Sequence, residues 1–172
     1  GAIIGSKKDI SNIRKKMLVQ VGSNISPFDA WLVMRGLRTL PQRLKYQEKT
    51  ANQLAFRLSQ VDKINAVNHI SLPEFKQYEL YKKQMTGSSG LFSFEVKTCK
   101  RNVAQFLKHL QLFKIGISWG GYESMVYISS LSKSYYREAS DQEKINVIIR
   151  LSIGLENVED LWDDLFQAIN YL

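Results

Sequence analysis

Arg150 is the residue whose type and surroundings point most clearly to chemistry. It lies inside the apolar segment 147–153, where five of the seven residues are aliphatic. Because side chains alternate across a strand, the pattern predicts that Ile149, Leu151 and Ile153 share one face and that Arg150 points from the other. A planar guanidinium can bind a carboxylate through two parallel hydrogen bonds. The segment therefore predicts a site for a carboxylate group.

A guanidinium in an apolar strand needs a partner, and two kinds of partner fit the sequence. The first is the carboxylate of a bound amino acid. The second is an internal ion pair with an acid of the C-terminal helix, such as Asp163 or Asp164. The residue pattern leaves both interpretations open.

The segment Ser118-Trp119-Gly120-Gly121 is the second candidate for binding. It offers backbone N–H groups and a large apolar side chain at the end of a strand, and the alternative is a tight turn that carries a core tryptophan. The segment 87–90, Gly-Ser-Ser-Gly, could cradle a phosphate. It lacks the lysine and the following helix of a P-loop, so we interpret it as a turn that enters a strand.

Composition argues against several other kinds of site. The formal charge is +8, but the basic residues are dispersed, which does not favour a nucleic-acid-binding arm. Cys99 is the one cysteine, so no intrachain disulfide is expected and a cytoplasmic location fits. His69 and His109 have no second ligand at metal spacing. No apolar run approaches the about 20 residues of a membrane span.

Hydrophobic periodicity and turn residues predict alternating helices and strands. Ser26 is expected to cap a helix with Pro27 and Asp29 in its first turn, and Pro41 to end or kink that helix. Asn102 and Asn157 are expected to begin two later helices, and apolar residues nearly surround the segment 30–34, which predicts burial. The other expected helices span 8–19, 42–60 and 75–84. The expected strands span 2–4, 64–67, 91–97, 113–117, 125–128 and 147–153, and a polar loop is expected over 129–143.

This order of elements predicts an α/β fold of the α+β kind, with helices packed on a mainly antiparallel sheet. Several blocks, in order, are similar to the Cys/Met-metabolism, or trans-sulfuration, family of pyridoxal-phosphate (PLP) enzymes. The blocks are Ser-Pro-Phe-Asp-Ala-Trp-Leu at 26–32, Arg-Gly-Leu-Arg-Thr-Leu at 35–40, Gly-Ser-Ser-Gly-Leu-Phe-Ser-Phe at 87–94, Ser-Trp-Gly-Gly-Tyr-Glu-Ser at 118–124, and Ile-Arg-Leu-Ser-Ile-Gly-Leu-Glu at 149–156.

The resemblance implies a type-I aminotransferase-like fold. Residues 1–40 would be the end of the large cofactor domain with its connecting helix, and residues 41–172 the C-terminal small domain. Arg150 would bind the substrate α-carboxylate, with help from the backbone of Ser118 and Trp119, and Trp119 would wall the side-chain pocket. The implied cofactor is PLP, the implied substrate a small amino acid such as cystathionine, and the implied assembly a cytoplasmic homotetramer.

The blocks around Trp119 are most similar to the cystathionine β-lyase branch, and Ile117 stands where γ-cleaving relatives often have glutamate. The resemblance also implies that the lysine that carries the cofactor lies upstream of Gly1, since Lys7 and Lys8 do not match its position. The chain by itself is therefore expected to be inactive and to bind no PLP. The alternatives are a γ-synthase or sulfhydrylase of the same family, and a non-catalytic basic α/β module that binds an acidic partner.

Overall fold

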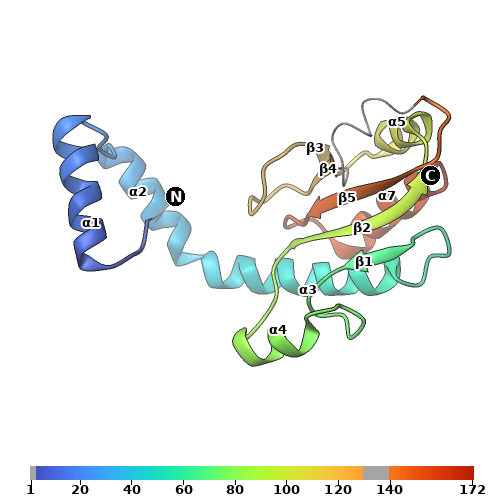
Figure 1. Ribbon diagram of the computed structural model, residues 1–172, viewed down its shortest axis with the longest axis horizontal. Helices are drawn as coiled ribbons and strands as arrows, with labels where there is room; N and C mark the ends of the chain where they lie inside the picture. Colours follow the sequence, from blue (N-terminus) through green and yellow to red (C-terminus); the bar gives the residue numbers. More distant parts are fainter. Residues whose placement is uncertain (1–2, 130–139) are drawn as a thin grey trace. The chain divides into compact units, whose positions relative to one another are not determined.

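The computed structural model describes residues 3–129 and 140–172 and divides the chain into two compact units, Gly1–Pro41 and Gln42–Leu172 (Figure 1). The first unit contains helix α1 (Lys7–Arg14), the π-helix η1 (Lys15–Gln20) and helix α2 (Pro27–Arg38). The second unit contains a sheet and the helices that pack on it.

The caps of the first unit follow from local sequence. The Ser26 side chain accepts the Asp29 N–H at 3.1 Å and donates to the Asp29 carboxylate at 2.7 Å, and Pro27 is the first helical residue. This confirms the predicted start of α2, because a serine before a helix satisfies one of its free N–H groups. The break before the next helix falls at Thr39, and Pro41 lies in the first turn of that helix, where its missing N–H is tolerated.

Two predictions for the first unit are wrong. Ile3 and Ile4 lie in no strand and are exposed, since a strand needs a hydrogen-bonded neighbour and the structure gives this segment none within residues 3–41. The apolar segment 30–34 is also not buried, and Trp31 is 51% exposed. An apolar helix is buried only where other layers surround it, and no residue of α2 is buried here.

The sheet of the second unit confirms the predicted fold class. Its strand order is β1-β2-β5-β4-β3, and every pairing is antiparallel except that of β3 with β4. Figure 1 shows β2 and β5 side by side, and they pair along their whole length, from Leu91 with Ser152 to Thr98 with Ile145. The strands are β1 (Ala66–Asn68), β2 (Leu91–Thr98), β3 (Lys114–Ile115), β4 (Met125–Ser129) and β5 (Ile145–Ser152).

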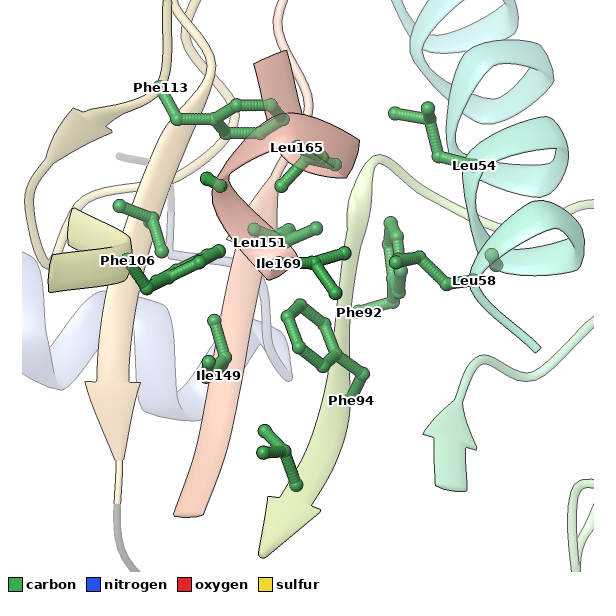
Figure 2. Close-up of a cluster of buried hydrophobic side chains, with 14 of the residues drawn as sticks. Leu54, Leu58, Phe92, Phe94, Phe106, Phe113, Ile149, Leu151, Leu165 and Ile169 are labelled. Atoms are coloured by element: carbon green, nitrogen blue, oxygen red, sulfur yellow. The ribbon is translucent and has the colours of Figure 1, made fainter. Parts of the chain in front are cut away.

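One face of this sheet is covered by helices and forms the core (Figure 2). The helices of the second unit are α3 (Leu40–Leu58), α4 (Tyr78–Gln84), α5 (Lys100–His109) and α7 (Val158–Ile169). Leu54 and Leu58 of α3, Phe106 of α5 and Leu165 of α7 belong to this core together with Phe94 of β2, whose ring lies edge-on to that of Phe106. The predicted alternation of 91–97 is confirmed by the buried Phe92, Phe94 and Val96. Leu44 of α3 lies outside this core and is exposed.

The two predicted asparagine caps have different outcomes. Asn157 caps α7 and accepts the Glu159 N–H at 2.8 Å, as expected. Helix α5 instead begins at Lys100, after Cys99, and the Asn102 amide donates to the Leu172 carbonyl. The Asn102 prediction is therefore wrong, because a long-range partner takes the side chain that the local pattern assigned to the cap.

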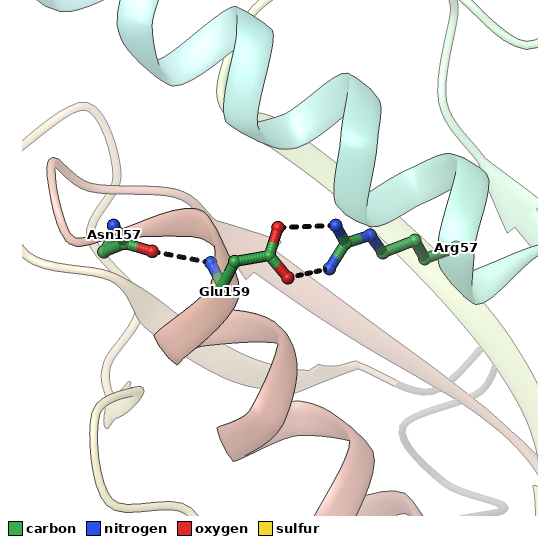
Figure 3. A network of polar contacts seen from close by, with 3 residues as sticks. All are labelled: Arg57, Asn157 and Glu159. Carbon is green, nitrogen blue, oxygen red and sulfur yellow. Dashed lines mark hydrogen bonds and ion pairs between the residues drawn. The ribbon is translucent and has the colours of Figure 1, made fainter.

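Outside the core, α3 and α7 are joined by an ion pair between Arg57 and Glu159, with N–O distances of 2.6 and 2.7 Å (Figure 3). The Arg57 hydrogen bond holds the pKa of the Glu159 carboxyl below its usual range. Most of the loop predicted for 129–143 lies outside the described residues.

Candidate functional site

Arg150 lies on the sheet face opposite the helical layer. In β5 it is flanked by Ile149 and Leu151, which are fully buried in the core, whereas Arg150 itself is half-buried. The register places it between Ser93 of β2 and Tyr127 of β4. Its guanidinium carbon is 5.1 Å from the centre of the Tyr127 ring, a cation–π distance. The predicted direction of the side chain is confirmed.

The guanidinium hydrogen-bonds to the start of the loop that contains Trp119. We call residues 117–124 the Trp119 loop. One terminal nitrogen of Arg150 donates to the Ile117 carbonyl at 2.5 Å and, at 3.4 Å, to the Ser118 carbonyl. The tertiary structure therefore brings together the three residues that the sequence singled out, although they are about thirty positions apart.

Among the described residues, the hydrogen bonds of the Arg150 guanidinium go to carbonyl oxygens. Within residues 3–129 and 140–172, Arg150 has no carboxylate at ion-pair distance, and its buried Nε has no hydrogen-bond acceptor. The predicted alternative, an ion pair with Asp163 or Asp164, is not present. Asp164 instead accepts the backbone N–H groups of residues 111–113. A half-buried cation without an anion favours the binding of one.

The Trp119 loop exposes the side chain that the sequence proposed as a wall. Trp119 is 66% exposed, so it is not a core tryptophan in a tight turn. Gly120 has φ of +77°, a left-handed conformation that favours glycine, and its N–H donates to the Ser152 hydroxyl at 3.3 Å. The indole thus stands at the surface, on a loop whose backbone is held from β5.

The far end of the loop is fixed by contacts that the sequence analysis did not identify. The Ser124 N–H and hydroxyl both donate to the Glu156 carboxylate at 2.8 Å, and the Ser124 hydroxyl accepts the Gly154 N–H at 2.8 Å. A Cβ on Gly154 would collide with the Tyr122 carbonyl and with the Glu156 side chain. The glycine of the 149–156 block is therefore required by close packing, and its glutamate holds the loop.

A hollow of about 130 Å³ lies beside Trp119 and is lined mainly by apolar groups. Residues of the 87–90 turn and of the Trp119 loop line it together, and the sequence did not predict that these two segments lie close to each other. It also includes Gln47, for which the sequence gave no functional signal. The lining residues are Leu44, Gln47, Ser89, Gly90, Leu91, Trp119, Gly120, Ser152 and Ile153.

The described residues do not fit a complete PLP site. The lining of the hollow contains no lysine to bond the cofactor and no basic group to hold its phosphate. Lys7 and Lys8 are exposed on α1, in the first unit. Residues 3–129 and 140–172 also contain no cluster of metal-ligating side chains and no helix long and apolar enough to cross a membrane.

The fold and the site define a class of protein: an α+β domain in which a half-buried arginine binds the loop that carries an exposed tryptophan. Residues 1–170 match the family described as Cys/Met metabolism PLP-dependent enzymes. The chain therefore belongs to this family, which confirms the predicted resemblance. The cofactor of the family is PLP.

Individual relatives carry different reactions. The chain is 37% identical to cystathionine beta-lyase of Escherichia coli over 84% of its own length and 38% of the relative's. It is also 37% identical to cystathionine gamma-lyase of Sus scrofa, over 87% and 38%. A solved structure of a putative O-acetylhomoserine (thiol)-lyase from Campylobacter jejuni, which carries a pyridoxyl-lysine phosphate, superposes with a TM-score of 0.81 at 30% identity, over 97% of this chain and 38% of that one. The chain thus spans about two fifths of the length of these relatives.

Proposed function

We propose that this chain supplies the substrate-carboxylate site of a PLP-dependent carbon–sulfur lyase, and that the intact enzyme eliminates homocysteine from the β-carbon of cystathionine, with pyruvate and ammonia as the other products. Residues 1–40 would then be the end of the large cofactor domain and residues 41–172 the small domain. We expect a cytoplasmic homo-oligomer, as in the family resemblance.

The observation that carries the proposal is the state of Arg150. Its guanidinium is half-buried, it donates to the Ile117 and Ser118 carbonyls, and it has no carboxylate partner among the described residues. An unpaired buried charge costs free energy. A carboxylate that binds Arg150 should therefore be stabilised more than one that binds a solvated arginine. This favours recognition of an amino acid by its α-carboxylate.

The residues of this chain would act by orientation. Arg150 would fix the α-carboxylate, which limits rotation of the substrate about its Cα and so presents the Cα–H bond in one direction. Trp119 would cover the substrate side chain and keep water from it. When bound, PLP supplies the electron sink for the chemistry, and the protein supplies binding and orientation.

Cystathionine β-elimination is the proposed reaction because Ile117 precedes Ser118, where γ-cleaving relatives often have glutamate. The equal identities to a beta-lyase and a gamma-lyase do not separate the two reactions. The second candidate is a cystathionine γ-synthase or an O-acylhomoserine sulfhydrylase, and the superposition on a putative O-acetylhomoserine (thiol)-lyase favours it. A non-catalytic basic module is not favoured, because the basic residues are dispersed and the chain belongs to a family of enzymes.

Titration of the chain with L-cystathionine, followed by the NMR signal of the Arg150 Nε–H group, tests the carboxylate site. We expect the ligand to shift this signal, and we expect Arg150→Gln to abolish binding because the amide has neither the charge nor the fork of donors. Arg101→Gln is the matched control, since Arg101 is exposed on α5. Binding that survives Arg150→Gln would exclude the proposed role.

Mixing the chain with PLP tests the second part of the proposal. Because no described lysine lines the hollow, we expect no protein-bound absorbance band in the visible range and no turnover of cystathionine. A stable yellow complex of the 172 residues with PLP would show that the chain carries its own anchoring lysine.

A further inference from the structure

The middle of the Trp119 loop is held from α3 by Gln47. The side-chain amide of Gln47 donates to the Gly121 carbonyl at 2.6 Å, although the two residues are 74 positions apart. Gln47 is 2% exposed, so this amide is shielded from water. A buried amide N–H group without an acceptor costs free energy. The Gly121 carbonyl is therefore held where it can accept this hydrogen bond.

Gln47 also touches the second glycine-rich segment that borders the hollow. A Cβ placed on Gly90 would lie 3.2 Å from the Gln47 Cβ and 2.9 Å from the Ile153 carbonyl oxygen. Gly90 in turn accepts the Ile153 N–H through its own carbonyl at 2.7 Å. Gln47 therefore lies between the 87–90 turn and the Trp119 loop, and the absence of a side chain at Gly90 allows its position.

The loop has little of its own structure to fix it there. Trp119 is exposed and Gly120 is left-handed, so neither the indole nor the local backbone preference specifies one conformation. Groups from outside the loop bind its backbone along its length: Arg150 binds the start, Gln47 the middle, and Glu156 the end at Ser124. The Ser152 hydroxyl and the Leu155 N–H also bind it, at Gly120 and Tyr122. Of these groups, Gln47 is the one that comes from the helical layer.

We propose that Gln47 is a positioning residue of the carboxylate site: its hydrogen bond to Gly121 fixes the Trp119 loop, and with it the Ile117 and Ser118 carbonyls that hold the Arg150 guanidinium. The functional meaning rests on the proposed function of Arg150, whereas the positioning of the loop does not. A change at Gln47 should therefore alter the surroundings of Arg150 without touching it.

Hydrogen exchange in the unmodified chain tests the contact itself. We expect the side-chain amide hydrogens of Gln47 to exchange with solvent about tenfold more slowly than those of Gln42, which is exposed on the same helix. Equal exchange rates for the two side chains would overturn the proposal, and this measurement requires no variant to fold.

Two variants then test the effect on the loop. Gln47→Leu keeps the size of the side chain but removes the donor, and Gln47→Glu sets a carboxylate against the Gly121 carbonyl. We expect both to shift the NMR signals of the Gly120 and Gly121 amides, the Trp119 indole and the Arg150 Nε–H, while the amides of β2 report an unchanged sheet. Gln42→Glu, the same chemical change at an exposed position, should move none of them. Unmoved loop signals in a folded Gln47 variant would overturn the proposal.

Titration with L-cystathionine separates this proposal from the function it rests on. We expect Gln47→Leu to weaken binding about fivefold, as loss of one shielded hydrogen bond implies, and Gln42→Glu to leave it unchanged. Undiminished binding in a Gln47 variant with displaced loop signals would overturn the positioning role. Failure of the unmodified chain to bind would contradict the proposed function alone, because the exchange and loop measurements still decide whether Gln47 holds the loop.

Discussion

The two faces of β5 differ in what holds them. On the helical side, Ile149 and Leu151 are fully buried among side chains of α3, α5 and α7. On the other side, Arg150 contacts a tyrosine ring and two backbone carbonyls, and one of its nitrogens has no partner among the described residues. The residues that stabilise the core thus alternate along one strand with the residue that we propose for binding, so neighbouring substitutions should have separate effects.

The largest expected effect is on the covered face. Ile149→Ala should lower the free energy of unfolding by about 2–5 kcal/mol, because it removes buried carbon and leaves a cavity in a packed core. Urea unfolding followed by circular dichroism measures this. Ile148→Ala, half-buried and next in sequence, is the matched control and should cost much less. Equal losses for the two would break the distinction between the faces.

The next largest effect is expected at Gly154, which follows β5 and packs against the Trp119 loop. Gly154→Ala should cost about 1–3 kcal/mol, because its Cβ would collide with the Tyr122 carbonyl and separate Glu156 from Ser124. Gly121→Ala is the control, since its Cβ would meet nothing closer than 4.0 Å. A neutral Gly154→Ala would show that this end of the loop is not closely packed.

A smaller effect concerns a titratable group within the covered layer. His69 packs edge-on against Phe92, and burial lowers the pKa of its imidazole, an effect that the Ser89 backbone and the Glu48 carboxylate oppose. The unfolded chain therefore binds a proton at a higher pH than the folded chain. Stability is complete above the ordinary histidine pKa of about 6.5 and falls as the pH drops below it, by at most about 1.4 kcal/mol per pH unit.

Urea unfolding between pH 7.5 and 5.5 checks this sign. The slope should be absent in His69→Gln and retained in His109→Gln. Stability that rises as the pH falls would mean that His69 is charged in the folded chain, which would contradict its place in the covered layer.

The smallest effect is expected on the outer surface of the helical layer. The pair of Arg57 and Glu159 is exposed to solvent, so a double-mutant cycle with Arg57→Ala and Glu159→Gln should give a weak, salt-sensitive coupling. The lowered pKa of Glu159 means that this contribution is present above the usual glutamate pKa of about 4.3 and is lost as the pH falls through the folded value. A coupling energy as large as the loss of unfolding free energy in Ile149→Ala would show that this surface pair stabilises the fold as much as a core residue does.

Local patterns predicted the elements whose signals are complete within a few residues. The caps at Ser26 and Asn157, the alternation of β2 and the two faces of β5 all depend on neighbours at fixed spacing, and the structure confirms each. The strand at 2–4 and the burial of 30–34 were wrong for the opposite reason. Both predictions depend on whether another element packs against the segment, and the spacing of apolar residues within the segment does not show this.

The candidate site divides in the same way. Sequence identified Arg150, Ser118 and Trp119, because arginine in an apolar strand and a glycine pair beside tryptophan are unusual in themselves. It did not identify Gln47, Ser124 or the contact of Glu156, whose residue types are ordinary. Gln47 is 74 residues from its partner and Ser124 is 32 residues from Glu156, so no local rule assigns these contacts.

By itself, the sequence determined the α+β class, the family and the direction in which Arg150 points, because alternation in a strand and ordered motifs are properties of the chain. Only the tertiary structure decided that the arginine meets carbonyl oxygens and no aspartate, and that an α3 glutamine holds the Trp119 loop. Those outcomes depend on which distant groups pack against each other, and the chain acquires that property only when the sheet and its helices come together.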